Sequence, residues 1–235
     1  MVKSYAAGGT EFQLTIPRLD IRAGAKLAFV GESGCGKSTL LEMLAMILRP
    51  SSSDRFRFSP VVNGDRHDVG AAWEAGDADQ LADLRSQHIG YVLQNGGLLP
   101  YLTVRENINL SRRLLHRPLD QVAERWAVKL KIGAQLDKLP AALSVGQRQR
   151  AAIARALAHD PAVLIADEPT AAVDPVNAAR ITDLVAGLAD ELGVTLIVAS
   201  HAHQLMQRAG LRLIDHRIEA VGENSMHVSV PDVKD

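Results

Sequence analysis

Several common features are scarce in this chain of 235 residues, and each scarcity narrows what the protein can be. Its single cysteine, Cys35, excludes a disulfide within the chain and fits a reducing compartment. Its 26 Lys and Arg residues are balanced by 27 Asp and Glu residues, so no overall basic excess indicates a nucleic-acid partner. Its apolar runs fall far below the roughly 18 residues that a membrane-spanning helix needs, so we expect any membrane role to depend on a partner protein.

The order of apolar and polar residues indicates an α/β protein. Short β-branched runs alternate with helical patterns, which is typical of buried and largely parallel strands. We expect strands at residues 11–16, 26–30, 55–62, 89–93, 162–166 and 194–199, and helices at residues 37–48 and 175–192. Residues 66–80 are rich in Asp, Gly and Ala, and we expect a loop there, followed by a short helix near residues 81–86. Residues 211–215 and 217–221 are expected to form a terminal hairpin.

A long helical stretch interrupts this alternation. From residue 95 to residue 159 the strand pattern disappears and helical periodicity dominates, with turn signals at Pro118 and Pro140. We therefore expect a single domain made of an α/β core (residues 1–94 and 160–222), an inserted helical subdomain (residues 95–159) and a tail (residues 223–235).

A glycine-rich motif follows the strand expected at residues 26–30. The run GESGCGKST at residues 31–39 matches the phosphate-binding pattern G-x-x-x-x-G-K-[ST], and a helical pattern comes directly after it. Glycines let backbone N–H groups wrap around phosphate oxygens, and the start of a helix adds its free N–H groups and positive dipole end. Lys37 would neutralise the terminal phosphates, and Ser38 would bind Mg²⁺. The alternative is a glycine turn that only caps a helix.

Two carboxylates follow another buried strand. Asp167 and Glu168 come directly after the apolar run at residues 163–166, at the strand end where ligands bind in open α/β sheets. Asp167 could hold Mg²⁺ beside Ser38, and Glu168 could orient and deprotonate an attacking water. Alone, such an acidic pair would usually be the start of a loop.

Further motifs resemble those of one enzyme family. LSVGQRQR at residues 143–150, ARAL at residues 154–157, DEPT at residues 167–170 and Ser200-His201 follow the glycine-rich motif in this order. The set resembles the ATP-binding-cassette (ABC) ATPases over nearly the whole chain. The resemblance implies a P-loop NTPase core of the RecA-like type with a mainly parallel sheet, an antiparallel β subdomain and an inserted α-helical subdomain.

The same resemblance assigns roles to single residues. Tyr5 would stack on adenine, Gln94 would touch Mg²⁺ or the attacking water, and His201 would hydrogen-bond the γ-phosphate. The alternatives are an edge-strand aromatic, an ordinary glutamine after a strand and a structural histidine. The implied catalytic residues are Lys37, Gln94, Glu168 and His201; the implied metal ligands are Ser38, Gln94 and Asp167; and the residues implied to contact ATP are Tyr5, Gly31, Ser33, Gly34, Cys35, Gly36, Lys37, Ser38, Thr39, Gln94, Ser144, Gly146, Gln147 and Asp174.

Two of these segments are implied to act across a dimer. The loop Ser144–Gly146 would contact the γ-phosphate held by a second copy, although a Ser-capped helix start is the plainer interpretation. Asp174 would communicate between the two sites. Val145 stands where the family usually has glycine, and because valine avoids positive φ we expect a tilted loop or weakened dimerisation.

The resemblance implies an ATP-hydrolysing transporter subunit that works as a head-to-tail dimer with ATP and Mg²⁺. It would lie in the cytoplasm on the inner face of the cell membrane, bound to an integral permease, with no nucleic-acid partner. Residues 84–107 look most like the lipoprotein-releasing and macrolide-exporting type. An importer subunit, a non-transport ABC ATPase and a non-hydrolysing scaffold stay open. Residues 96–102 could form part of the permease groove, or Leu98 and Leu102 could simply pack in the core.

Overall fold

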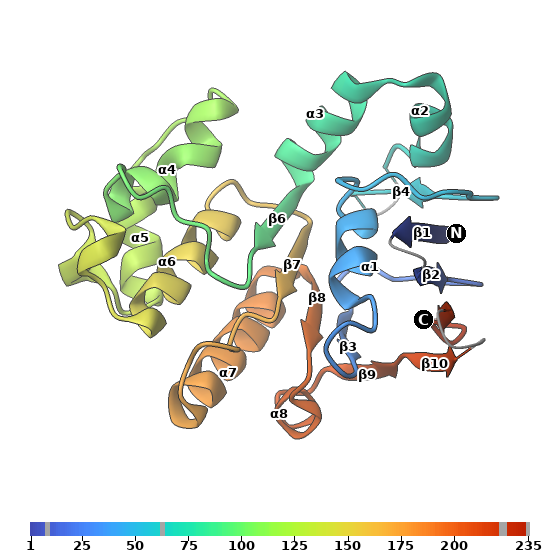
Figure 1. The fold of residues 1–235 in the computed structure, drawn as a ribbon. Coiled ribbons are helices and arrows are strands. Elements are labelled where there is room, and N and C mark those ends of the chain that lie inside the picture. The colour runs from blue at the N-terminus through green and yellow to red at the C-terminus, as the bar shows by residue number, and fades with distance from the viewer. Residues whose placement is uncertain (8–9, 62–63, 221–224, 234–235) are drawn as a thin grey trace.

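The computed structural model describes residues 1–7, 10–61, 64–220 and 225–233, and its centre is a five-stranded sheet (Figure 1). The strands lie in the order β6-β7-β8-β3-β9, and each neighbouring pair is parallel. Their bounds are Lys26–Val30 for β3, Ile89–Val92 for β6, Val163–Asp167 for β7, Thr195–Ser200 for β8 and Arg212–Asp215 for β9. The predicted α/β class with a mainly parallel sheet is confirmed.

Alternating side chains along these strands divide the core in two. Leu27 and Phe29 of β3 belong to one buried cluster, whereas Ala28 and Val30 belong to the other. Ile165 in β7 and Ile197 in β8 join the first cluster, and their neighbours in sequence join the second. Successive side chains of a strand point to opposite faces, so this sheet is buried on both faces by helices, as its uninterrupted apolar runs indicate.

The helices form these two layers and a separate helical part (Figure 1). Helix α1 contacts β7 and β8 on one face, and α6 and α7 pack on the other. The bounds are α1 Lys37–Leu44, α2 Val69–Ala75, α3 Ala78–His88, α4 Val104–Leu114, α5 Val122–Lys129, α6 Val145–Leu157, α7 Pro175–Leu192 and α8 His203–Arg208, with short 3₁₀ helices at Gly133–Gln135 and Pro140–Ala142. Among the described residues, no helix is both long and apolar enough to cross a membrane.

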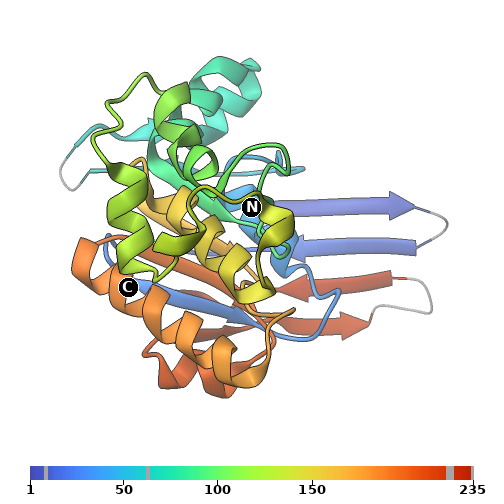
Figure 2. The ribbon, with the colours of Figure 1, turned by 90° about the vertical axis from the view of Figure 1, so that its left-hand side faces the viewer.

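A second sheet joins both ends of the chain. It has four strands in the order β1-β2-β11-β10, and Figure 2 shows the N-terminal and C-terminal strands side by side in it. Their bounds are β1 Val2–Ala7, β2 Thr10–Thr15, β10 Arg217–Ala220 and β11 Ser225–Ser229. Two of its pairings are antiparallel, and β2 pairs with β11 in parallel. A separate two-stranded sheet pairs β4 (Arg57–Phe58) with β5 (His67–Asp68).

The predicted terminal hairpin is wrong. Strand β9 pairs in parallel with β3 in the central sheet, whereas β10 pairs with β11 in the second sheet. The predicted hairpin end at Val221 lies outside the described residues. The predicted tail at residues 223–235 also contains a strand, β11, which lies between β2 and β10 in the second sheet. The partner of β9 lies far away in sequence and the partner of β10 lies beyond residue 221, so the local pattern of residues 211–221 could not reveal either.

The predicted loop at residues 66–80 is wrong as well. It contains β5 and α2, and α3 begins at Ala78, well before residue 81. Asp68 and Asp77 cap the two helices by accepting hydrogen bonds from Ala71 N (3.0 Å) and Gln80 N (3.0 Å). Alanine is the best helix former, so an Asp-capped and Ala-rich segment favours a helix more than a loop.

Two other predicted elements are shorter in the structure. Helix α1 ends at Leu44, not at residue 48, because Met46 adopts a left-handed φ of 57°. The strand expected at residues 55–62 is limited to the two residues of β4, and Val62 lies outside the described residues. The helix expected at residues 175–192 agrees with α7.

Asn107, in α4, fixes the segment that leads from β6 into the helical part. The side chain is fully buried; its Oδ1 accepts from Leu99 N at 2.8 Å, and its Nδ2 donates toward the carbonyl oxygens of Leu99, Leu102 and Thr103 at 3.0–3.1 Å. One amide therefore satisfies buried backbone groups that have no regular secondary structure around them.

We predict that Asn107→Leu lowers the free energy of unfolding by about 1–3 kcal/mol or more, because several buried polar groups lose their partner together. Urea denaturation followed by circular dichroism measures this loss. Asn95→Ala, at an exposed asparagine, is the control and should leave the midpoint unchanged. Equal midpoints for Asn107→Leu and the wild type would contradict the role assigned to this amide.

His159, just after α6, makes stability depend on pH. The side chain is 3% exposed, its Nε2 donates to Ile89 O at 3.2 Å, and burial lowers the pKa of His159 to about 4. Arg117 and Arg112 lower this pKa further, whereas Asp160 raises it. The unfolded chain binds a proton near pH 6.5 that the folded chain refuses until about pH 4, so this contribution to stability is complete above pH 6.5 and is lost as the pH falls through that window.

We predict that His159→Gln removes on the order of 2 kcal/mol of the stability difference between pH 7 and pH 5. Urea midpoints of wild type and variant at several pH values measure the difference between the two curves. His203→Gln, at an exposed histidine, should keep the wild-type pH dependence. Parallel curves for His159→Gln and the wild type would show that this histidine does not titrate in the expected window.

Candidate functional site

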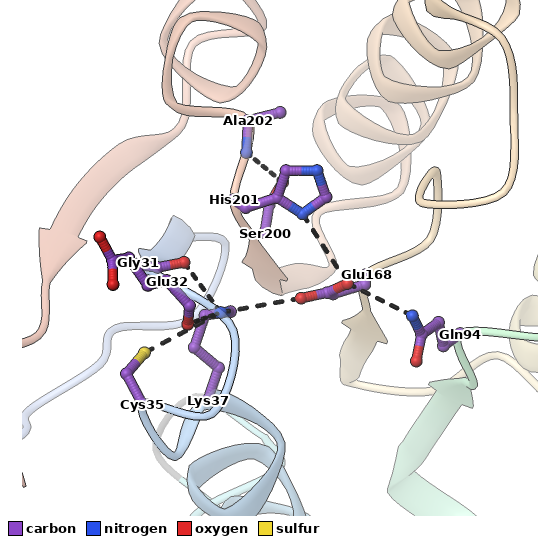
Figure 3. A network of polar contacts seen from close by, with 9 residues as sticks. All are labelled: Gly31, Glu32, Cys35, Lys37, Gln94, Glu168, Ser200, His201 and Ala202. Carbon is purple, nitrogen blue, oxygen red and sulfur yellow. Dashed lines mark hydrogen bonds and ion pairs between the residues drawn. The ribbon is translucent and has the colours of Figure 1, made fainter.

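Four consecutive strands of the central sheet each deliver one part of the candidate site. Gln94 follows β6, Glu168 follows β7, His201 follows β8, and the glycine-rich loop follows β3. The strands are parallel, so their carboxyl ends meet at one edge of the sheet. Residues separated by more than a hundred positions in sequence therefore lie close together, as Figure 3 shows.

The glycine-rich loop curls between β3 and α1 in a backbone shape that requires glycine. Gly34 and Gly36 have φ angles of 84° and 86°, and a Cβ atom on Gly36 would lie 2.8 Å from Phe12 Cζ. Gly36 is the N-cap residue of α1, and no side chain caps the first N–H groups of this helix. These N–H groups and the dipole of α1 are therefore available to an anion.

The Lys37 side chain is the centre of the polar network (Figure 3). It is only 4% exposed, and its Nζ donates to the carbonyl oxygens of Gly31 (2.9 Å) and Glu32 (2.7 Å). Its Nζ also lies 3.7 Å from Glu168 Oε1 and 3.9 Å from Cys35 Sγ. A buried ammonium needs such partners. Two of them come from the glycine-rich loop, together with which Lys37 would bind phosphate.

Asp167 offers an oxygen suited to a metal ion. Its Oδ1 is buried and has no hydrogen-bond partner among the described residues. Burial raises the pKa of the Asp167 carboxyl, a hydrogen bond with Ser38 and the charge of Lys37 lower it, and the charge of Glu168 raises it. A divalent cation next to Ser38 would supply the missing partner of a hard oxygen ligand, so these residues fit Mg²⁺.

Glu168 lies where a base for an attacking water is expected. Its φ of 42° is unusual for a non-glycine residue, and its N–H donates to Ala199 O at 2.9 Å. Its Oε2 accepts from Gln94 Nε2 at 3.4 Å and lies 3.8 Å from His201 Nδ1 (Figure 3). The structure thus brings all four predicted catalytic residues (Lys37, Gln94, Glu168 and His201) into one network.

These groups line or border an open cavity of about 360 Å³. Its lining consists of Tyr5, Phe12, Ser33, Gly34, Gly36, Lys37, Ser38, Thr39, Gln94 and Glu168. Tyr5 is 41% exposed, and its ring lies 6.2 Å from that of Phe12 at an interplanar angle of 35°. The two rings form an apolar part of the cavity lining next to Gly36 of the glycine-rich loop, and a planar base could stack there.

Phe12 was not among the predicted site residues. It lies within the strand predicted at residues 11–16, and no local motif marks it as part of a site. Its place in the cavity follows from β2 pairing with β1, where Phe12 lies opposite Tyr5. Gly31 and Cys35 were predicted to contact the ligand, but neither lines the cavity; the Cys35 side chain is 1% exposed, and its Sγ lies 3.9 Å from Lys37 Nζ.

The segment Ser144–Gly146 does not line this cavity, nor do Gln147 and Asp174. Ser144 caps α6 together with Gln147: Ser144 Oγ accepts from Gln147 N at 3.3 Å, and Gln147 Oε1 accepts from Ser144 N at 2.9 Å. Because a hydroxyl can accept and donate at once, Ser144 keeps a donor for an outside ligand. This hydroxyl hydrogen is not used by the helix cap.

The structure removes the strain expected at Val145. This residue is the first of α6, is not among the residues with positive φ, and is 40% exposed. Valine is compatible with this helical conformation, so the predicted tilt of the loop has no backbone cause.

Asp174 caps α7 by accepting from Asn177 N (3.1 Å) and Asn177 Nδ2 (2.8 Å), and these bonds lower the pKa of its carboxyl.

Comparison with known proteins places this arrangement in context. Residues 14–171 match the family model described as ABC transporter. The chain is 39% identical over 209 residues to the methionine import ATP-binding protein MetN of Caulobacter vibrioides, covering 88% of this chain and 59% of that protein. It is 35% identical over 231 residues to the lipoprotein-releasing system ATP-binding protein LolD of Idiomarina loihiensis, covering 96% of this chain and 93% of that protein.

A solved structure has the same fold. The dimeric ATP-binding cassette MJ0796, in a post-hydrolysis state bound to ADP and Pi, superposes with a TM-score of 0.76 at 30% identity. The match covers 91% of this chain and 90% of that chain. At this identity and coverage the likeness extends beyond the layout of the central sheet to nearly the whole described chain.

Cys35 yields a prediction about the loop. Its Sγ lies close to Lys37, and a Cβ atom on Gly31 would lie only 2.9 Å from it, so an alkyl group does not fit while the loop is closed. We predict that N-ethylmaleimide labels the native protein roughly a hundredfold more slowly than the urea-unfolded chain, because labelling requires local opening. The labelled protein should no longer bind nucleotide.

Mass spectrometry follows the labelling of this single thiol, and a fluorescent ATP analogue reports binding. Cys35→Ala is the control: it should bind the analogue before and after treatment with the reagent. Fast labelling of the native protein with full binding retained would show that the thiol is exposed and lies away from the phosphate-binding groups.

Proposed function

The chain belongs to the ABC transporter family as an ATP-binding subunit with ATPase activity, and on this basis we propose that two copies close head-to-tail around two Mg·ATP to drive a membrane permease in export or lipid extraction. One observation carries the dimeric part of the proposal. The cavity contains the glycine-rich loop and Glu168, but the donors at Ser144 and Gly146 do not line it. A second copy would supply them, and twofold symmetry would complete both sites together.

Binding of the triphosphate would use donors that are already arranged. The free N–H groups at the start of α1 face the cavity, and Lys37 would exchange carbonyl partners for phosphate oxygens. Tyr5 and Phe12, in the same cavity, would receive the adenine. Closure around ATP would then add Ser144 Oγ–H and Gly146 N–H of the second copy to the γ-phosphate.

Glu168 would position and deprotonate the attacking water. Gln94 and His201 both contact its carboxylate from neighbouring strands, so these three side chains surround the place where a water next to the γ-phosphate would lie. His201 is 62% exposed and is free to turn toward the phosphate. After hydrolysis the γ-phosphate no longer links the two copies, and ATP's preference for the closed dimer is lost.

Ser38 and Asp167 would hold the metal ion, with Gln94 as a third ligand. When bound, Mg²⁺ would neutralise charge on the phosphate oxygens. The buried oxygen of Asp167 that has no partner among the described residues supports this placement.

The surface next to Gln94 supports a permease partner. Tyr101 is 72% exposed and Leu93 is 49% exposed, whereas Leu98 packs against the core. The predicted segment at residues 96–102 therefore divides into a part that packs inward and a part that is free to contact another protein. Such a partner would hold the chain at the inner face of the cell membrane.

The direction of transport rests on likeness to relatives. The motifs of residues 84–107 resemble the lipoprotein-releasing and macrolide-exporting type, and the similarity to LolD extends over 96% of this chain. The similarity to the import protein MetN favours an importer subunit as the second candidate. Copurification from membranes, followed by mass spectrometry, identifies the permease bound to the chain and separates the exporter and importer candidates. An importer subunit would copurify with a permease that has a substrate-binding partner.

Glu168→Gln tests the hydrolytic role. We predict that the rate constant for turnover falls at least about a hundredfold, because a general base contributes roughly 10²–10⁴ in rate. The variant should still bind ATP and should accumulate as a nucleotide-bound dimer. Steady-state phosphate release and size-exclusion chromatography with ATP measure the two effects.

The control is Glu74→Gln, an exposed glutamate of α2 outside the cavity, which should turn over like the wild type. Turnover by Glu168→Gln at the wild-type rate would remove Glu168 from the mechanism. A Glu168→Gln protein that binds ATP yet stays monomeric at high concentration would count against the shared site.

A further inference from the structure

A tight turn of two glycines begins two residues after Gln94. Gly96 and Gly97 have φ angles of 74° and 60°, and a Cβ atom on Gly97 would lie 2.6 Å from Leu93 Cδ1. Gly96 is buried, and its N–H donates to Leu93 O at 2.8 Å. Since the turn begins two residues after Gln94, any shift of the turn moves the backbone that carries Gln94.

Arg155 of α6 holds this turn. Its two terminal nitrogens donate to Gly97 O at 2.7 Å and to Gly96 O at 3.1 Å, across 58 and 59 positions in sequence. The planar guanidinium offers two parallel donors, so it fixes both the position and the orientation of the two carbonyl groups. Arg155 is half-buried, and this burial lowers the pKa of its guanidinium.

Gln149 faces the same turn from the same helix. A Cβ atom on Gly96 would lie 3.6 Å from Gln149 Oε1 and 3.4 Å from Ala152 Cβ. Gln149, Ala152 and Arg155 are spaced three residues apart, so they share one face of α6. Gln149 is 4% exposed, and its Nε2 is buried without a hydrogen-bond partner among the described residues.

A buried amide donor without a partner is costly, and the oxygen of the same amide lies beside Gly96 of the turn. The opposite end of α6 carries Ser144 and Gly146, which the proposed function assigns to the nucleotide of the second copy. Helix α6 therefore binds the backbone next to Gln94 in its own chain through Arg155. In the proposed dimer its other end would donate hydrogen bonds to the nucleotide of the second copy.

We propose that Arg155 is a positioning residue, assisted by Gln149, that sets the placement of Gln94 according to the position of α6. This inference rests on the proposed function, because it needs ATP hydrolysis at a site shared between two copies. Movement of α6 toward the second copy's nucleotide pulls the two-glycine turn through Arg155, and Gln149 gains a carbonyl partner in the closed state. Gln94 and Glu168 then reach their working positions together.

A double-mutant cycle tests the coupling. Arg155→Lys keeps the charge but loses the fork, and we expect kcat to fall about tenfold while the Kd for a non-hydrolysable ATP analogue changes less than about twofold. In the Gln94→Ala background the same substitution should cause almost no further loss, because its effect passes through Gln94. Gln149→Leu should behave in the same way.

The matched control is Arg112→Lys in α4. Arg112 also donates to backbone carbonyls, those of Pro118 (2.6 Å) and Ala158 (3.2 Å), but it does not contact the two-glycine turn. It should keep the wild-type kcat, both alone and with Gln94→Ala. If Arg155→Lys fails to fold, as judged by circular dichroism, the cycle of Gln149→Leu with Gln94→Ala decides the question.

The outcomes separate the inference from the function beneath it. Independent, multiplicative losses for Arg155→Lys and Gln94→Ala would overturn the inference while leaving the ATPase intact, as would a loss of analogue affinity without a loss of kcat. A wild-type protein that hydrolyses no ATP, alone or with its permease, would instead overturn the proposed function. Non-additive losses in kcat with unchanged affinity are the result that supports positioning through Gln94.

Discussion

The arrangement of the site depends on keeping one ammonium group out of water. Lys37 is almost fully buried, and a buried charge is stable only where oriented dipoles or an opposite charge replace its hydration. Gly31 O, Glu32 O and Glu168 supply that replacement. The two carbonyls can point at Lys37 only because the loop bends through left-handed glycines, so the glycines serve the cation as well as the anion that it would bind. The contact with Glu168 also joins the ends of β3 and β7 by charge.

The central sheet makes this contact between Lys37 and Glu168 possible. In the order β6-β7-β8-β3, each strand ends in one functional group, and the groups meet without long loops to carry them. The strands are held from both faces, by α1 on one and by α6 and α7 on the other, so their ends cannot shift independently. The strained φ of Glu168 is tolerated in this frame, because its N–H is bonded to Ala199 on the adjacent strand.

Sequence reasoning found the parts of the site that have local signatures and missed those that depend on tertiary contacts. The glycine-rich loop, the carboxylates at the end of β7 and the extent of helix α7 could all be read from neighbouring residues. Phe12 enters the cavity only through the pairing of β1 with β2. Arg155 meets Gly97 across 58 positions, and an arginine in a helical pattern is usually exposed, so nothing local identifies it. The hairpin predicted at residues 211–221 was wrong because β9 pairs with the distant strand β3, and β10 pairs with β11, which lies beyond the predicted segment.

The segment at the start of α6 bears on how a second copy can complete the site. Its capping box, made by Ser144 and Gln147, is already formed in the single chain. The Ser144 hydroxyl accepts one bond within the helix start and still has its hydrogen to donate, so the loop needs no refolding before it meets a γ-phosphate. Ordering a loop at an interface costs free energy and weakens association. Here the start of α6 is already ordered in the single chain, so this cost does not arise when two copies associate. In the proposed dimer, the binding energy of ATP between two copies would therefore act on the movement of α6 and the chain attached to it, which is the property a motor requires.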